Sequence, residues 1–282
     1  MIKEIKNILE IVLYFAVFFA PMIAAAGGLL GIRAGVYTLA SAIILSLLIY
    51  NFSDRIILRW YHAKVTDRFD RLTIKSSISR PKFHIFESAL PAIFTVGTLG
   101  KNFIIISSGA IEKMDENEME VLIAHEIGHI ENHDVALNTV AALFAGLITS
   151  ISSIAVWASM FSGFGRRTDP APSIIYLLIM GIVSIPASLF LQATISRERE
   201  YRADRFASDL IKDPKDLAAT LENLQNYTKE YDGDQINPGH AHMLPVNPLK
   251  VEEVYDVHLS LFNTHPDIEE RKKKLVERAQ VR

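Results

Sequence analysis

The chain has 282 residues, 50% of them hydrophobic, and a formal net charge of −3. The apolar excess is typical of a protein that is partly embedded in a membrane. The absence of cysteine excludes disulfides and thiolate metal ligands. The sequence also has no Gly-rich phosphate loop and no basic segment interleaved with aromatic residues, which argues against nucleotides and nucleic acids as partners.

Four stretches without Asp, Glu, Lys or Arg are long enough to hold the roughly 20 apolar residues that cross a bilayer. They lie between Glu10 and Arg33, Arg33 and Asp54, Asp134 and Arg166, and Asp169 and Arg197. The sequence therefore predicts an integral membrane protein with four transmembrane helices. The first stretch exceeds the ~7–15 apolar residues of a signal peptide, so the first two spans are expected to form a retained hairpin. The alternative is a soluble fold with long buried helices.

Basic residues near the predicted spans indicate their orientation. Most of them precede the first span or follow the second or fourth: Lys3, Lys6, Arg55, Arg59, Lys64, Arg68, Arg71, Arg197, Arg199, Arg202 and Arg205. The loops on the other side contain only Arg33, Arg166 and Arg167. Because basic residues are enriched on the cytoplasmic side, both termini and residues 53–134 are predicted to face the cytoplasm, and the loop 163–173 the opposite side.

Between the second and third spans, three segments have the composition of β-strands: residues 82–87, 92–98 and 103–107. They predict a small sheet. An edge strand of such a sheet can bind an extended polypeptide through backbone hydrogen bonds. The alternative is an edge that simply caps the domain.

Residues 125–134 have the sequence HEIGHIENHD, which contains a His-Glu-x-x-His motif. Asp115 and Glu118 precede it with the pattern of a capping box, which predicts that the motif lies inside a helix. Gly128 lowers helix propensity by about 1 kcal/mol relative to Ala, and it is expected to admit a close neighbour.

On a helix, His125 and His129 project from one face and can bind one metal ion. Glu126 lies beside them and could take a proton from a water molecule that zinc acidifies. The pattern indicates hydrolysis at a catalytic zinc site. The plainer alternative is two core histidines and a surface glutamate on an ordinary helix.

A catalytic zinc needs a third protein ligand, and the motif region does not supply it. His133 lies ~12 Å from His125 along the helix axis, too far to share one ion, and is expected to be a helix-end residue or a partner of a ligand. The longer HExxHxxGxxH pattern is absent, since Asn132 stands in place of its Gly and Val135 in place of its third His.

Glu200 is the better candidate for the third ligand. It follows the fourth predicted span, whereas the motif precedes the third, so a hairpin of these spans returns both segments to one membrane face at heights of roughly 8–9 Å. Asp204, one turn later, could accept an N–H from a ligating histidine. Arg197, one turn earlier, is expected to pair with a carboxylate. A solvated charge run is the alternative for its neighbours Glu198, Arg199 and Arg202.

The carboxy-terminal part is predicted to contain a helix over 206–229 and a loop over 231–248 that covers the cleft. Thr264 to Asp267 have the pattern of a helix start, and Arg271 that of a charge on a solvated helix. The remaining histidines are expected to be solvated rather than metal-bound: His62, His84, His240, His242 and His258.

Three groups of residues together resemble a known family: His125-Glu126-x-x-His129 with Asn132 and Asp134; Ser196-Arg197-x-x-Glu200-Tyr201-x-Ala203-Asp204; and His265-Pro266 with Arg271. The family is that of the HtpX-type membrane-bound zinc endopeptidases, which are related to the CAAX prenyl proteases. The resemblance covers most of the chain. It implies three zinc ligands (His125, His129 and Glu200), a general base (Glu126) and a residue that orients a ligand (Asp204). It also implies that His265 and Arg271 line the cleft near the tetrahedral intermediate.

The chain departs from this family at one strand. Relatives carry an Asn-Ala-Phe-like stretch before the motif helix, on the strand thought to hold extended substrate. Here the nearest equivalent is Pro91-Ala92-Ile93-Phe94-Thr95. The family's substrate subsites therefore cannot be carried over to this strand.

Together these observations predict a mainly α-helical integral membrane protein whose four transmembrane helices carry a zincin-like α+β catalytic domain. The expected parts are a hairpin (1–52), a catalytic part (53–134), a second hairpin (135–196) and a cytoplasmic part (197–282). The predicted function is that of a multi-pass cell-membrane endopeptidase with one Zn²⁺ per chain, which cleaves membrane or misfolded polypeptides near the cytoplasmic membrane face in protein quality control.

Two alternatives remain at this point. A protease of prenylated tails is ranked lower, because those relatives enclose a large membrane chamber with more spans. A membrane scaffold with structural zinc would normally have four protein ligands, and the sequence offers three.

Overall fold

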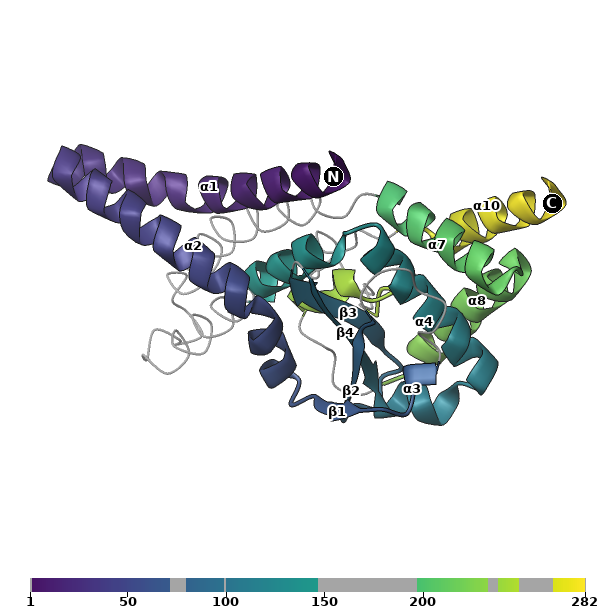
Figure 1. The fold of residues 1–282 in the computed structure, drawn as a ribbon. Coiled ribbons are helices and arrows are strands. Elements are labelled where there is room, and N and C mark those ends of the chain that lie inside the picture. The colour runs from purple at the N-terminus through teal and green to yellow at the C-terminus, as the bar shows by residue number, and fades with distance from the viewer. Residues whose placement is uncertain are drawn as a thin grey trace, which may run out of the picture.

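The structure is a computed structural model that describes residues 2–71, 80–98, 100–146, 197–232, 238–248 and 266–281. Figure 1 shows two long helices, α1 (Ile2–Leu30) and α2 (Ile32–Trp60), that extend away from a mixed α/β body. Within the described ranges, two helical segments are long and apolar enough to cross a membrane, Asn7–Leu30 and Ile32–Trp60. They coincide with the first two predicted spans.

The other predicted spans are described only in part. The apolar helix Val135–Gly146 covers the beginning of the third span. The fourth span and the loop 163–173 lie outside the described residues.

α1 and α2 form a hairpin whose open end joins the body. The chain reverses at Gly31, which adopts φ 92, and the two helices come close near this turn, where a Cβ on Gly35 would lie 3.1 Å from the Cα of Gly27. At the other end, the Asn7 side chain of α1 donates a 2.7 Å hydrogen bond to the carbonyl oxygen of His133, and Ile57 of α2 packs fully buried against the sheet. The beginning of α1 and the end of α2 therefore lie on the same side, beside the body.

The body contains a four-stranded sheet in the order β1-β2-β4-β3. Its strands are β1 (Lys64–Thr66), β2 (Lys82–Phe86), β3 (Ile93–Thr98) and β4 (Lys101–Ser107). β2 and β4 are parallel, whereas the β1–β2 and β3–β4 pairs are antiparallel. The three predicted strands are confirmed, and β3 is an edge strand. β1 was not predicted, because it has only three residues and none of them is buried.

The helices of the body are α3 (Ser108–Lys113), α4 (Glu116–Glu131), α7 (Arg197–Ile211), α8 (Pro214–Glu230), the short 3-10 helix η2 (Pro238–Met243) and α10 (Ile268–Val281). The helix predicted over 206–229 is confirmed for residues 206–211 and 214–229, but a break divides it between α7 and α8. Lys212 has φ 61, and α8 starts anew with Asp213 as its N-cap and Pro214 in its first turn.

α4 is the central helix of the body. One of its sides packs on the sheet residues Ile93, Ile104 and Ile106, and the same apolar cluster continues into α7 and α8 (Figure 1). The opposite sheet face packs against the end of α2 and the residues that follow η2. α4 is thereby buried between the sheet and α7.

Candidate active site

The His-Glu-x-x-His motif lies on α4, as predicted. The capping box at its start is confirmed: the Asp115 side chain accepts from the Glu118 amide at 2.8 Å, and the Glu118 side chain accepts from the Asp115 amide at 3.1 Å. The packing of α4 on both sides buries the motif, so that His125 is 0% and His129 7% exposed. The surface glutamate of the plainer alternative is not observed, because Glu126 is 1% exposed.

Glu200 reaches the motif because α7 packs directly against α4. The two helices come closest at Gly128 and Ala203: a Cβ on Gly128 would lie 2.9 Å from the Cα of Ala203. The close neighbour expected at Gly128 is therefore Ala203. Glu200, one turn before Ala203 and 5% exposed, is turned toward the two histidines.

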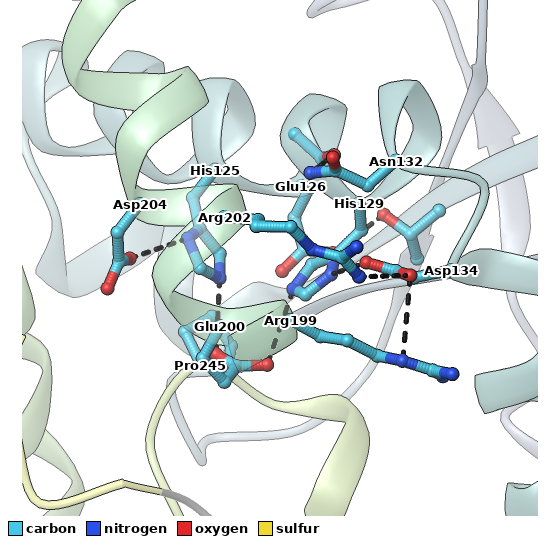
Figure 2. A network of polar contacts seen from close by, with 12 residues as sticks. His125, Glu126, His129, Asn132, Asp134, Arg199, Glu200, Arg202, Asp204 and Pro245 are labelled. Atoms are coloured by element: carbon cyan, nitrogen blue, oxygen red, sulfur yellow. Dashed lines mark hydrogen bonds and ion pairs between the residues drawn. The ribbon is translucent and has the colours of Figure 1, made fainter. Parts of the chain in front are cut away.

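Both imidazoles present their Nε2 atoms to the Glu200 carboxylate (Figure 2). Nε2 of His125 is 3.6 Å from Oε2 of Glu200, and Nε2 of His129 is 3.5 Å from Oε1. One ligand atom from each of the three residues lies within 4.8 Å of the others. No other such group of three potential ligands occurs in the part of the chain that the structure describes.

The residues fit a zinc ion in both spacing and chemistry. In tetrahedral coordination with bonds of 2.0–2.2 Å, neighbouring ligand atoms are about 3.3–3.6 Å apart, close to the distances between the imidazoles and Glu200. Nε2 of the fully buried His125 accepts or donates no well-formed hydrogen bond within the described residues. Since buried polar atoms are normally satisfied, Nε2 of His125 is available for a cation.

The opposite nitrogen of each imidazole faces an aspartate. Nδ1 of His125 lies 3.0 Å from Oδ1 of Asp204, and Nδ1 of His129 lies 3.6 Å from Oδ2 of Asp134. A carboxylate on Nδ1 favours the tautomer with a proton there and leaves Nε2 as a ligand. Asp204 thus occupies the place predicted for it, and Asp134 takes the matching place at His129.

Arg271 lies behind Asp204 and is fully buried. Its guanidinium donates to both oxygens of Asp204 at 2.8 and 2.6 Å and to the carbonyl oxygen of Pro245 at 2.6 Å, and its Nη1 is 3.5 Å from Oε2 of Glu200. The prediction of a solvated charge on a helix, drawn from the local pattern, is wrong. The segment after η2 is tied through Pro245 to the same guanidinium.

Asp134 is surrounded by arginines of α7. Nη2 of Arg202 lies 3.3 Å and Nε of Arg199 3.7 Å from Oδ1 of Asp134, and Arg199 also pairs with Glu10 of α1. The solvated alternative is therefore wrong for Arg199, which is 6% exposed, and for Arg202, which is partly buried. Charge pattern alone did not reveal this, because the partners come from α1 and from the turn that follows α4.

Glu126 has one contact that the sequence did not suggest. The Thr95 hydroxyl on β3 donates a 2.6 Å hydrogen bond to Oε2 of Glu126. The signal was present as the single polar residue in the apolar run Ile93 to Val96, since a buried hydroxyl needs an acceptor.

The carboxylates around the two imidazoles raise the pKa of both histidines. Burial alone would lower the pKa of His125, but Asp204 and Glu200 raise it to about 9. Burial also opposes protonation of His129, yet its pKa is raised, mainly through Asp134. Burial raises the pKa of Glu126, whereas Arg271 overcomes burial to lower the pKa of Asp204. The surroundings therefore favour positive charge between the histidines and Glu200.

Other predicted residues have mixed outcomes. Arg197 is exposed at the first residue of α7, and the expected carboxylate partner is not seen within the described ranges. His265 and His258 lie outside those ranges. His133, with φ 61, is at the end of α4 as expected, and His62 is exposed.

The prediction that His240 and His242 are solvated is wrong. They are 0% and 4% exposed, because η2 packs against the end of α2 and the helix Val135–Gly146. Nδ1 of His240 shares a 2.9 Å hydrogen bond with the Tyr61 hydroxyl, and Nε2 of His242 lies 3.2 Å from the carbonyl oxygen of Asn138. η2 is thus bound to the end of α2 through His240 and to the helix Val135–Gly146 through His242.

Comparison with known proteins gives a family match and several similar proteins. The family described as Peptidase family M48 matches residues 59–279. A protease HtpX homolog from Desulfatibacillum aliphaticivorans is 33% identical over 257 residues, which cover 87% of this chain and 81% of the relative. A protease HtpX homolog from Thermococcus kodakarensis is 33% identical over 239 residues, which cover 80% of each chain. The crystal structure of S. mikatae Ste24p aligns with 98% of this chain and 66% of its own, at 16% identity and a TM-score of 0.49.

Proposed function

This chain belongs to peptidase family M48, and from that premise we propose that it is a zinc-dependent endopeptidase of the membrane. It is a metallopeptidase, and the resemblance to the HtpX-type proteases drawn from its motifs is confirmed. The observation that carries the proposal is the convergence of His125, His129 and Glu200 from two helices, with Glu126 beside them. Among the residues that the structure describes, the cluster has three ligands rather than four, which supports a catalytic site over a structural one.

In this proposal His125, His129 and Glu200 hold the zinc ion, and Asp204 and Asp134 hold the imidazoles. Zinc, when bound, polarises the scissile carbonyl and acidifies a water molecule. Glu126 takes a proton from the attacking water and later donates it to the leaving amine. His265 donates a hydrogen bond to the developing oxyanion. Arg271 acts through Asp204 and Glu200, since its buried guanidinium contacts these two carboxylates.

The substrate is proposed to add to the edge strand β3. β3 pairs only with β4 in the described sheet, so the backbone groups on its other edge are the proposed partners of an extended polypeptide. The backbone amide of Gly97 donates a hydrogen bond to Oγ1 of Thr139 at 2.8 Å. This amide is therefore not available to pair with a substrate backbone. Substrate pairing is therefore assigned to the segment from Ile93 to Thr95, next to Glu126.

Membrane and misfolded polypeptides are proposed as the substrates, in protein quality control at the cytoplasmic membrane face. Two apolar helices join the catalytic body directly, and α1 contacts the site's surroundings through Glu10 and Arg199. The proposed topology keeps the four-span division of the chain, with the catalytic parts 53–134 and 197–282 in the cytoplasm. Degradation profiles of membrane proteins in cells with active and Glu126→Gln enzyme test the role. An assay with a prenylated peptide tests the lower-ranked alternative.

The decisive experiment uses the full chain in detergent with an unstructured polypeptide substrate. Glu126→Gln should keep one zinc per chain and lose at least ~10²-fold in kcat, since it removes the general base. Glu116→Gln, on the exposed first turn of the same helix, is the matched control and should stay active. Undiminished cleavage by Glu126→Gln would refute the assignment of the base.

A further inference from the structure

Thr95 lies on the face of β3 that points toward α4. Side chains alternate along a strand, so Thr95 shares its face with Ile93, which packs in the apolar cluster of α4. Phe94 and Val96 point the other way, into the cluster that contains Ile57 of α2. The antiparallel pairing of Thr95 with Ile104 of β4 holds this register. The Thr95 hydroxyl is thus the polar group that β3 presents to α4 in an otherwise apolar contact.

The Thr95 hydroxyl donates a hydrogen bond to one of the two oxygens of the Glu126 carboxylate. Oγ1 of Thr95 donates to Oε2 at 2.6 Å, and the two residues are 5% and 1% exposed. The other oxygen, Oε1, is buried and accepts no hydrogen bond from any residue that the structure describes. The two oxygens are therefore distinguished, with one held by Thr95 and the other left to accept a proton.

α4 alone cannot make the two carboxylate oxygens of Glu126 different from each other. The terminal torsion of a glutamate side chain is broad and roughly two-fold, so α4 fixes where the carboxylate is but not how its plane is rotated. Thr95 is β-branched and stiff at χ1, so its hydroxyl is a well-placed donor. Small errors in the placement of a reacting group can cost about 10²-fold in rate.

We propose that Thr95 is a positioning residue for the general base: its hydroxyl fixes the rotation of the Glu126 carboxylate so that Oε1 faces the attacking water. The inference rests on the proposed role of Glu126 and deepens it. Thr95 keeps its own proton throughout. The proton that moves passes from the water to Oε1 and then to the leaving amine.

The test compares Thr95→Val, which keeps the shape but removes the hydroxyl, with Thr95→Ser, which keeps the hydroxyl. With a fluorogenic peptide that the wild-type full chain cleaves, Thr95→Val should lower kcat by about 10–100-fold and change KM by less than about twofold. Thr95→Ser should stay within about fivefold of wild type. Zinc content should remain one per chain in both variants. Thr98→Val, the same substitution on the same strand, is the control and should leave kcat unchanged.

A second arm shows whether Thr95 acts through Glu126. In a Glu126→Gln background, Thr95→Val should cost no further rate in single-turnover measurements, because the group it positions is gone. Equal losses in both backgrounds, an undiminished kcat in Thr95→Val, or a Thr95→Ser variant as slow as Thr95→Val would each overturn the inference. An active Glu126→Gln enzyme would instead overturn the proposed base, so the two failures are distinguishable.

Discussion

Gly128 of the motif helix lies against the backbone of Ala203 so closely that a Cβ atom would come within 2.9 Å of both the Cα and the carbonyl oxygen of Ala203. α4 and α7 can reach this separation because residue 128 has no side chain. The contact lies one turn from Glu200 along α7 and one residue from His129 along α4. It therefore sets the distance between the carboxylate and the two imidazoles.

Gly128→Ala should push α7 away from α4 and weaken zinc binding by tenfold or more, on the order of the effect of losing a residue that orients a ligand. Overpacking costs roughly 1–3 kcal/mol, against which Ala regains about 1 kcal/mol of helix propensity, so the loss of stability should be modest. Zinc affinity measured by competition with a chromogenic chelator checks this. Gly28→Ala, at a helical glycine with open space around it, is the control and should bind zinc as wild type does.

Arg271→Met should lower the free energy of unfolding by about 3–5 kcal/mol, because it leaves the buried Asp204 carboxylate without its charged partner. Arg278→Met, on the same helix, removes a partly exposed pair with Asp209 and should cost less than about 1 kcal/mol. Denaturant unfolding of the two variants in detergent provides the comparison. Equal effects would show that the Arg271–Asp204 pair is not held in a buried environment.

Zinc binding should strengthen as the pH rises from 6.5 to about 9. The pKa of His125 is raised from 6.5 to about 9, so across this range zinc must displace a proton from the imidazole. Each displaced proton changes the apparent affinity by up to about tenfold per pH unit. In the zinc-free protein, the stability from protonated His125 is fully present below pH 6.5 and is lost as the pH rises through 9. Chelator competition at several pH values, and melting of the zinc-free protein, measure both trends; a flat affinity would contradict them.

Acid should lower the stability of the folded protein, because His240 is buried in its neutral form. Burial lowers the pKa of His240 from 6.5 to about 3, so between these values the unfolded chain binds a proton that the folded chain does not. Stability should therefore fall as the pH drops below 6.5. His240→Gln removes this titration, and its melting temperature should decline less steeply than that of wild type between pH 6.5 and 4.5. Parallel curves for the two proteins would show that His240 is not buried in its neutral form.

The parts of the fold that were predicted correctly depend on local pattern. The capping box at Asp115 and Glu118 starts α4 through contacts three residues apart, and the alternation of apolar residues with turn residues marks β2, β3 and β4. The break within the helix predicted over 206–229 also has a local cause, since Asp213 and Pro214 form a helix start that competes with continuation.

The partners of buried charges depend instead on which helix faces meet. Arg199 and Arg271 each have the local sequence of a solvated charge, yet one pairs with Asp134 and Glu10 and the other with Asp204. The hydrogen bond between Thr95 and Glu126 likewise joins residues on separate elements. The spacing of residues within one helix or strand does not indicate which residue of another element will be the partner.

The sequence by itself predicted the motif helix, the two amino-terminal apolar helices and Glu200 as a ligand candidate, because capping pattern, length without charges and position relative to the apolar stretches can be read along the chain. The tertiary structure alone decided that Asp134 faces the imidazole of His129, that the guanidinium of Arg271 binds Asp204, and that Thr95 donates a hydrogen bond to Glu126. These contacts require α4, α7, α10 and β3 to pack at particular separations. Such separations are set by side-chain volume at the contacts, as at Gly128 and Ala203, rather than by spacing along the chain.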